Sequence, residues 1–122
     1  MGGTVQLGQE WLVDASGCDP QALRTPAALA ALFEALVVEL SLHVVGTPQW
    51  HVFPGPGGVT GVAMLSESHL AIHTFPEHRS AALSIYSCRT RPTPPLAALL
   101  ERHLGAKDVV VREVPRGAKA AP

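Results

Sequence analysis

The sequence predicts an α+β fold, a two-layer sandwich in which an antiparallel β-sheet carries two helices on one face. Segments typical of strands outnumber helical patterns, and they follow one another without interruption between two helices. The length of 122 residues is that of one ordinary domain, residues 1–122. Hydrophobic residues make up 47% of the chain and charged residues 16%, which excludes a disordered chain.

The first elements expected are a strand and then helix. Residues 4–13 are mostly apolar and suit a strand, and Gly17-Cys18-Asp19-Pro20 then supplies a turn and a helix cap. Thr25-Pro26 repeats the cap signal. Apolar residues then recur at steps of three and four, which predicts an amphipathic helix as far as about Leu42.

Short strands are expected next. Residues 43–45 and 49–53 are apolar or β-branched pieces on either side of Gly46-Thr47-Pro48, and they predict one or two strands around a turn. The glycines and prolines of residues 53–58 predict a loop, because they support neither a strand ladder nor a helix.

Three consecutive strands are expected in the middle of the chain, at residues 59–65, 69–74 and 81–87. Ser66-Glu67-Ser68 forms the first connection between them and residues 76–80 form the second. These strands form hairpins or a meander, and they would give most of the sheet.

A helix and a last strand complete the predicted fold. Thr93-Pro94 predicts a cap for a helix that ends at Gly105. Residues 108–114 are mostly apolar and predict a closing strand. The tail, residues 116–122, is expected to be frayed.

Charge and hydropathy exclude some functions. The formal net charge is −1, so the chain lacks the basic field that nucleic acid requires. Glu34 and Glu39 interrupt the most apolar stretch, residues 26–42, before it could span a bilayer, so we expect no membrane association. The N-terminus lacks the basic and apolar regions of a signal peptide, which predicts a cytoplasmic protein.

The scarcity of charge also predicts a partner. A sheet with helices on one face needs a cover for the other face, and a second copy of the chain in a symmetric homodimer would provide it. Cys18 and Cys88 are the only cysteines, and two distant thiols in a reducing compartment are more often free than bridged.

Metal binding and serine hydrolysis are weaker hypotheses. His69 and His73 lie four residues apart and would share a strand face, but no third ligand accompanies them, so we expect no metal. Ser68 and His73 could serve a Ser-His-Asp hydrolase, but the chain has neither a G-x-S-x-G turn nor an obvious orienting acid nearby.

The stretch Leu65–Glu77 reads LSESHLAIHTFPE. It closely resembles the signature of prokaryotic S-adenosylmethionine decarboxylase proenzymes, in which Ser-Glu-Ser-His is followed by Ile-His-Thr, an aromatic residue and Pro-Glu. The resemblance continues into Ala81-Ala82 and Tyr86-Ser87-Cys88. Chain length and element order are similar to the family over nearly the whole sequence.

The resemblance implies that the chain cleaves itself between Glu67 and Ser68. A serine in a strained turn can attack the carbonyl of the residue before it, and the ester so formed can eliminate to dehydroalanine. Hydrolysis would leave a pyruvoyl group, a covalent cofactor generated from Ser68, on the new N-terminus. The products would be a beta chain, residues 1–67, and an alpha chain, residues 68–122, and the homodimer would consist of cleaved protomers.

Further roles follow from the resemblance. His73 would handle the proton transfers of self-cleavage, assisted by Thr60, where the family usually has Ser. The pyruvoyl carbonyl would form a Schiff base with the substrate amine and accept the electrons released with carbon dioxide. Cys88 would return a proton to the product. The alternative for Cys88 is a buried strand residue.

The substrate implied is S-adenosylmethionine, whose decarboxylation provides the aminopropyl donor for spermidine. Phe53 and Phe75 would stack on the adenine, and Glu77 would hold the ribose hydroxyls. The alternatives are core positions for the two phenylalanines and a solvated turn position for Glu77.

Departures from the family pattern leave other functions open. Phe75 replaces the usual Trp, and Arg89 follows Cys88 where Gly is usual. A pyruvoyl-dependent decarboxylase of another amino acid, ornithine or arginine, would keep Ser68, His73 and Cys88 with a changed pocket. A catalytically silent relative that only pairs with another chain is the third hypothesis.

Overall fold

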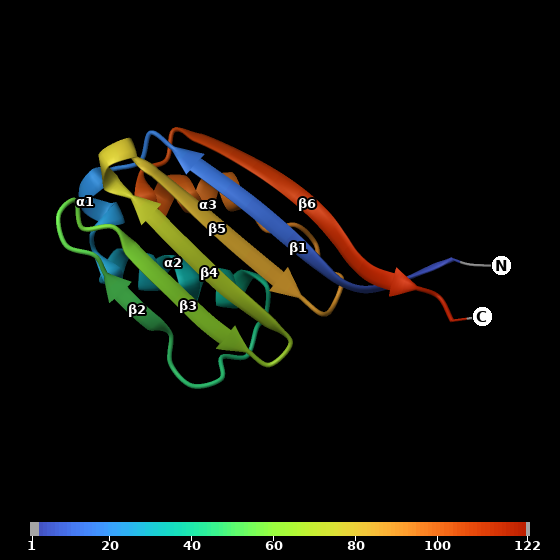
Figure 1. Ribbon diagram of the computed structural model, residues 1–122. Helices are drawn as coiled ribbons and strands as arrows, with labels where there is room; N and C mark the ends of the chain where they lie inside the picture. Colours follow the sequence, from blue (N-terminus) through green and yellow to red (C-terminus); the bar gives the residue numbers. More distant parts are fainter. Residues whose placement is uncertain (1–2, 122) are drawn as a thin grey trace.

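The computed structural model describes residues 3–121, in which six strands form one antiparallel sheet (Figure 1). The strands are β1 (Thr4–Ser16), β2 (Gln49–Val52), β3 (Val59–Leu65), β4 (Ser68–Phe75), β5 (Ser80–Ser87) and β6 (Asp108–Lys119). Their order across the sheet is β2-β3-β4-β5-β1-β6. The three consecutive strands expected in the middle of the chain are therefore adjacent in the sheet.

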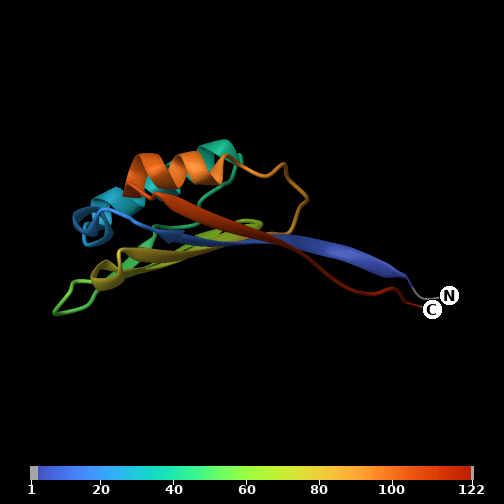
Figure 2. The ribbon, with the colours of Figure 1, turned by 90° about the horizontal axis from the view of Figure 1, so that it is seen from above.

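The helices cover one face of this sheet. They are α1 (Pro20–Leu23), α2 (Pro26–Glu39) and α3 (Leu96–Leu104), with a short 3-10 helix, η1 (Pro76–His78), between β4 and β5. Figure 2 shows α1, α2 and α3 on the same side of the sheet, and within residues 3–121 no α-helix covers the opposite side. The predicted two-layer α+β fold is confirmed. No helix within residues 3–121 is long and apolar enough to cross a membrane.

The core lies between the helices and the sheet. Its largest fully buried side chains come from both layers and include Trp11, Leu29, Leu32, Leu36, Leu70, Ile72, Leu83, Ile85, Leu100 and Leu104. Burying an aliphatic side chain of this size contributes about 1.5–3 kcal/mol. Because burial alternates along β4 and β5, every second side chain points to the helices and the rest point to the open face.

Helix α2 ends at Glu39 rather than at the predicted Leu42. The backbone of Ser41 is left-handed, with φ of 52°. This turn allows the N–H of Leu42 to donate to the carbonyl of Val37 at 2.9 Å, and that of Ser41 to donate to Val38 at 3.2 Å. These bonds satisfy carbonyls that the helix end leaves free, and the apolar residues that follow therefore lie outside the helix.

One of the one or two short strands predicted after α2 is present. It is β2, at the edge of the sheet, whereas residues 43–45 form no strand and Val44 makes only a single bridge with Leu65. Residues 53–58 form an irregular loop, as expected.

The start of α3 also differs from the prediction. The helix begins at Leu96, its N-cap is Pro95, and no side chain caps it. The predicted Thr93-Pro94 cap is therefore wrong. The hydroxyl of Thr93 instead accepts a hydrogen bond from the indole N–H of the buried Trp11, at 3.3 Å.

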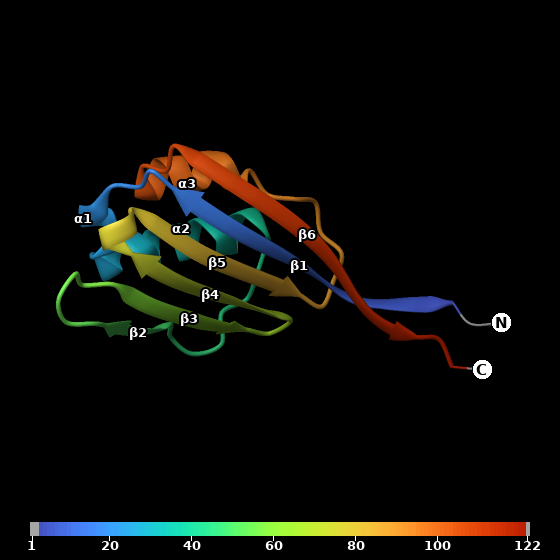
Figure 3. The ribbon, with the colours of Figure 1, turned by 45° about the horizontal axis from the view of Figure 1, so that its top comes forward.

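Strand β6 is longer than the sequence indicates. It was expected to end at residue 114, but it continues to Lys119 because Gln6 pairs with Gly117 and Thr4 with Lys119 on β1. Figure 3 shows β1 and β6 extending together beyond the other strands. The prediction of a frayed tail is thus wrong for residues 116–119, and residue 122 lies outside the described residues.

The buried hydroxyl of Thr74 ties the two layers together. It donates to the carbonyl of Leu23 at 2.7 Å and accepts from the N–H of Val59 at 2.9 Å.

A Thr74→Val substitution leaves both backbone groups unpaired, so we expect it to lower the free energy of unfolding by about 2 kcal/mol or more. Urea unfolding measures this free energy. The measurement is made in a Ser68→Ala background, which is meant to keep the chain intact. The exposed Thr47→Val control should change it by less than about 0.5 kcal/mol, and an equal loss in both variants would contradict the prediction.

Candidate active site

The turn between β3 and β4 places Glu67 and Ser68 at one end of the sheet. Ser66 and Glu67 alone form the turn, and Ser68 is the first residue of β4 rather than part of the connection as predicted. Ser68 pairs with Leu65 on β3 and with Ser87 on β5. Its backbone is therefore held from both sides.

The strain expected at this turn does not take the form of left-handed backbone. Within residues 3–121, the non-glycine residues with positive φ are Ser41 and Arg79, and neither belongs to the turn. The predicted self-cleavage at Glu67–Ser68 would therefore depend on the groups around this bond rather than on a left-handed turn.

The Ser68 side chain is buried without a partner. The residue is 8% exposed, and its Oγ has no hydrogen-bond partner among residues 3–121. Buried hydroxyls are nearly always hydrogen-bonded, so an unpartnered one calls for a functional explanation. The cavity beside it has a volume of about 290 Å³ and is lined by Ser41, Leu42, His43, Ser66, Glu67, Ser68, Arg89 and Arg91.

The chain that follows β5 contacts the carbonyl that Ser68 would attack. The backbone N–H of Cys88 donates to the carbonyl oxygen of Glu67 at 2.7 Å. A donor at this place polarises the carbonyl and stabilises negative charge that develops on its oxygen. Cys88 is exposed, so the alternative of a buried strand residue is wrong, whereas Cys18 is buried and burial raises the pKa of its thiol.

Two arginines bind the side chain of Glu67. Arg89 contacts both carboxylate oxygens, with its Nη2 donating to Oε1 at 2.9 Å, and Arg91 Nη2 lies 3.8 Å from Oε2. In the sequence, Arg89 is visible only as a departure from a family pattern, and no motif marks Arg91. Nothing local in the sequence indicates these contacts, because Arg89 and Glu67 lie 22 residues apart in the chain.

Thr60 and His73 form a pair on the open face of the sheet. They are cross-strand partners on β3 and β4, and Thr60 Oγ1 is hydrogen-bonded to His73 Nδ1 at 3.0 Å. His69 shares this face, as the four-residue spacing predicts. The hydroxyl fixes the orientation of the imidazole.

The same pair lines a pocket with the residues expected to bind substrate. The pocket has a volume of about 320 Å³ and is lined by Phe53, Pro54, Pro56, Gly58, Val59, Thr60, His73, Thr74, Phe75 and Glu77. Phe53 and Phe75 are 49% and 45% exposed, so the alternative of core positions is wrong for both. At Gly58 a Cβ atom would approach the carbonyl oxygen of Thr74 to 2.7 Å, so glycine allows the loop to pack closely against the backbone of β4.

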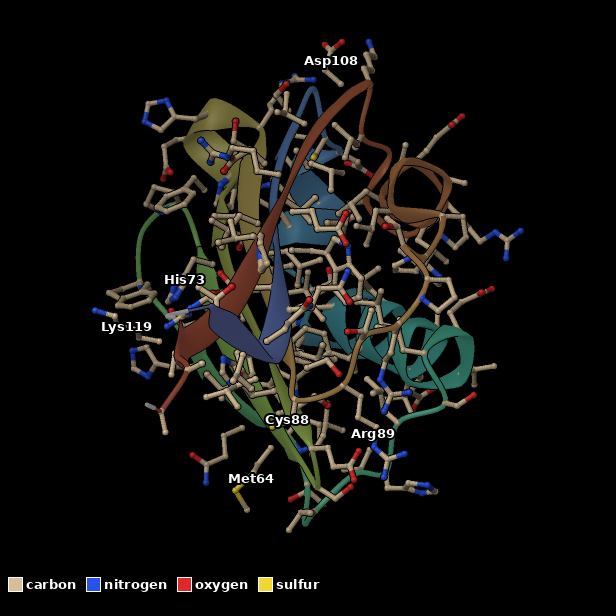
Figure 4. All side chains as sticks on the ribbon, turned by 90° about the vertical axis from the view of Figure 1, so that its right-hand side faces the viewer. Met64, His73, Cys88, Arg89, Asp108 and Lys119 are labelled. Atoms are coloured by element: carbon tan, nitrogen blue, oxygen red, sulfur yellow. The ribbon has the colours of Figure 1, made fainter. Side chains whose placement is uncertain are left out.

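The expected site residues therefore form two separate groups. The turn group contains Glu67, Ser68 and Cys88, whereas His73 belongs to the pocket at the other end of β4. Ser68 and His73 are five positions apart along the strand, about 16 Å, and their side chains point to opposite faces. Figure 4 shows Cys88 and Arg89 close together and His73 apart from them.

This arrangement fits a class of chains in which a serine attacks the peptide bond before it. A buried free hydroxyl, a polarised carbonyl and a fixed turn are the parts that such an attack requires. An aromatic pocket with one carboxylate is suited to an organic ligand that carries hydroxyl or cationic groups.

Comparison with known proteins identifies the family. Residues 9–117 match the family described as S-adenosylmethionine decarboxylase. The S-adenosylmethionine decarboxylase proenzyme of Thermococcus kodakarensis is 34% identical over 113 residues, which cover 91% of this chain and 77% of that protein. The proenzyme of Shouchella clausii is 35% identical over 112 residues, which cover 91% of this chain and 85% of that protein. The chain belongs to the S-adenosylmethionine decarboxylase family.

A solved structure agrees with this assignment. The adenosylmethionine decarboxylase of Aquifex aeolicus superposes with a TM-score of 0.76 at 27% sequence identity. The match covers 93% of this chain and 92% of that one. The two proteins therefore share their fold over nearly their whole lengths.

Proposed function

We propose that this chain is a self-cleaving, pyruvoyl-dependent decarboxylase of S-adenosylmethionine. The observation that carries the proposal is the buried, unpartnered hydroxyl of Ser68 beside the carbonyl of Glu67, whose oxygen accepts a hydrogen bond from Cys88. Family membership and the proenzyme names of the relatives support it. The product would serve as the aminopropyl donor for spermidine.

Self-cleavage begins with the Ser68 hydroxyl. Its Oγ bonds to the carbonyl carbon of Glu67, the C–N bond breaks, and the Ser68 nitrogen takes up the hydroxyl proton. The Cys88 N–H stabilises the negative charge that passes through the Glu67 oxygen. Loss of the Ser68 α-proton then breaks the Cβ–O bond and releases Glu67 as a carboxylate. Water converts the dehydroalanine into a pyruvoyl group, and ammonia leaves.

The residues at the turn suit this prosthetic group. A pyruvoyl carbonyl condenses with the amino group of an amino acid and draws in the electron pair released with carbon dioxide. The cavity beside Ser68 provides space there. Cys88 directly follows Ser87, the strand partner of Ser68, and its accessible thiol would deliver a proton to the product.

The pocket group suits the substrate. The exposed faces of Phe53 and Phe75 can stack on an adenine and attract a sulfonium cation, and the Glu77 carboxylate can accept hydrogen bonds from ribose hydroxyls. These assignments lie in one pocket of about 320 Å³. Ornithine and arginine have no aromatic group that would use these faces.

A homodimer of cleaved protomers would join the two groups. The open face carries exposed apolar side chains, including Val62, Met64, Phe75 and Val110, and a second copy is a natural cover for them. A two-fold axis that runs across the strands reverses their direction, so the end of β4 in one copy lies over its beginning in the other. His73 of one copy would then lie over the beginning of β4 in its partner, on the opposite side of the sheet from the buried Ser68 side chain and next to the turn that bears it. The cytoplasmic location and the absence of nucleic-acid and membrane partners stay predictions.

The first test is the intact mass of the purified protein. We expect two fragments, residues 1–67 and 68–122, with a carbonyl on the second fragment that reacts with hydrazine. The Ser68→Ala variant should stay as one chain, because the attacking hydroxyl is absent. An unbroken wild-type chain would favour the silent relative, and a cleaved Ser68→Ala chain would contradict attack by serine.

The substrate is tested by carbon dioxide release. The cleaved protein should decarboxylate S-adenosylmethionine in preference to ornithine and arginine. Cys88→Ser should still be cleaved but should lose about 100-fold or more in turnover, as expected when a general acid is removed. Release from ornithine or arginine alone would point to the other amino acid decarboxylases, and full turnover by Cys88→Ser would make the thiol dispensable.

Mixed dimers test whether His73 acts across the interface. Ser68→Ala and His73→Gln should each remain uncut when expressed alone. When the two are co-expressed, the His73→Gln chains in mixed dimers should be cleaved, because the Ser68→Ala partner supplies an intact His73. Masses of the separated chains provide the measurement. No cleavage in confirmed mixed dimers would place His73 action within one chain.

A further inference from the structure

The Glu67 carboxylate is held by two arginines of unequal exposure. The side chain of Arg89 is 69% exposed and contacts both carboxylate oxygens. The side chain of Arg91 is 18% exposed and lies behind it, 3.8 Å from one oxygen. Arginine presents a planar fork of donors that matches a carboxylate, so this contact fixes orientation as well as charge.

Arg91 is a rigid support for this contact. Its Nε donates to the hydroxyl of the buried Ser87 at 3.0 Å, and its backbone N–H donates to the side chain of Gln9 at 2.9 Å. Its Nη1 also donates to the carbonyl of Leu40. These bonds tie the segment after β5 to β1 and to the end of α2.

The same segment holds Glu67 at a second point. The N–H of Cys88 donates to its carbonyl oxygen at 2.7 Å, while the next residue, Arg89, holds its side chain. The N–H of Arg89 donates to Ser87 at 3.2 Å, which limits the movement of this segment. Because both the carbonyl and the carboxylate of Glu67 are held, its peptide plane has little freedom to rotate.

We propose that Arg89, supported by Arg91, is a positioning residue for self-cleavage. It holds the Glu67 side chain so that the carbonyl carbon of Glu67 stays presented to the Ser68 hydroxyl. Arg89 touches neither reacting atom and acts through Glu67. Attack within a chain depends steeply on such orientation. The inference rests on the proposed self-cleavage at Glu67–Ser68, and it identifies the residue that orients Glu67 for this reaction.

The test follows the cleavage rate of freshly synthesised protein by intact mass after cell-free translation. Arg89→Gln should slow cleavage by about 2- to 5-fold, the range that corresponds to the loss of one exposed ion pair. Arg89→Lys keeps the positive charge but loses the forked pair of donors. Its cleavage rate should therefore lie between those of the wild type and Arg89→Gln. Added salt should slow the wild type and leave Arg89→Gln unchanged, because an exposed ion pair is screened.

A double-mutant cycle identifies the contact. Glu67→Gln should slow cleavage at least as much as Arg89→Gln, because it also weakens the contact with Arg91. Arg89→Gln should cause no further slowing in the Glu67→Gln chain, because the contact between the two residues is already lost. Arg102→Gln, on the exposed side of α3, removes the same charge elsewhere and should cleave at the wild-type rate. In a Ser68→Ala background, Arg89→Gln should keep the thermal unfolding midpoint, which excludes misfolding as the cause of slow cleavage.

The outcomes separate the two claims. If the wild type is cleaved and Arg89→Gln is cleaved at the same rate, the positioning role of Arg89 is overturned and the proposed self-cleavage stands. Effects of Arg89→Gln and Glu67→Gln that multiply in the double variant would also overturn it, because the residues would then act independently. An uncut wild-type chain would overturn the proposed self-cleavage, and the positioning role with it.

Discussion

The register of β4 between β3 and β5 is the constraint on which the rest of the structure depends. The turn of Ser66 and Glu67 sets it, with Ser68 opposite Leu65 on one side and Ser87 on the other. Side chains alternate along a strand, so a slip of one residue would turn every side chain of β4 to the wrong face. The register therefore places Ser68 against the helices and His73 on the open face.

This alternation explains why the predicted site residues form two separate groups in one chain. The turn combines a free buried hydroxyl with a polarised carbonyl, and the open face combines the Thr60–His73 pair with an aromatic pocket. No rotation of a side chain spans five strand residues, so the two groups cannot meet within one protomer. In the proposed homodimer, a second copy would cover the exposed apolar side chains of the open face and bring the two groups of different copies close together.

Local patterns account for much of the fold and of the candidate site. The strands, the two main helices and the motif around Ser68 follow from residues close together in the chain, and Phe53, Phe75 and Glu77 do line one pocket. The predictions are wrong where a residue far away in the chain determines the local structure. Thr93 bonds to Trp11 instead of capping α3, and residues 116–119 pair with β1 instead of fraying. The end of α2 depends on the left-handed backbone of Ser41, which no glycine marks in the sequence.

The sequence by itself determined the order of strands and helices and the family motif. This motif marks the bond between Glu67 and Ser68 as the predicted cleavage site. The sequence determined both because periodicity and motifs are carried by neighbours in the chain. Only the tertiary structure decided that Ser68 is buried without a hydrogen-bond partner among residues 3–121, that Cys88 and Arg89 hold Glu67, and that His73 lies near the far end of the strand. These facts depend on strand pairing and on contacts between residues far apart in the chain, which form only when the sheet is assembled.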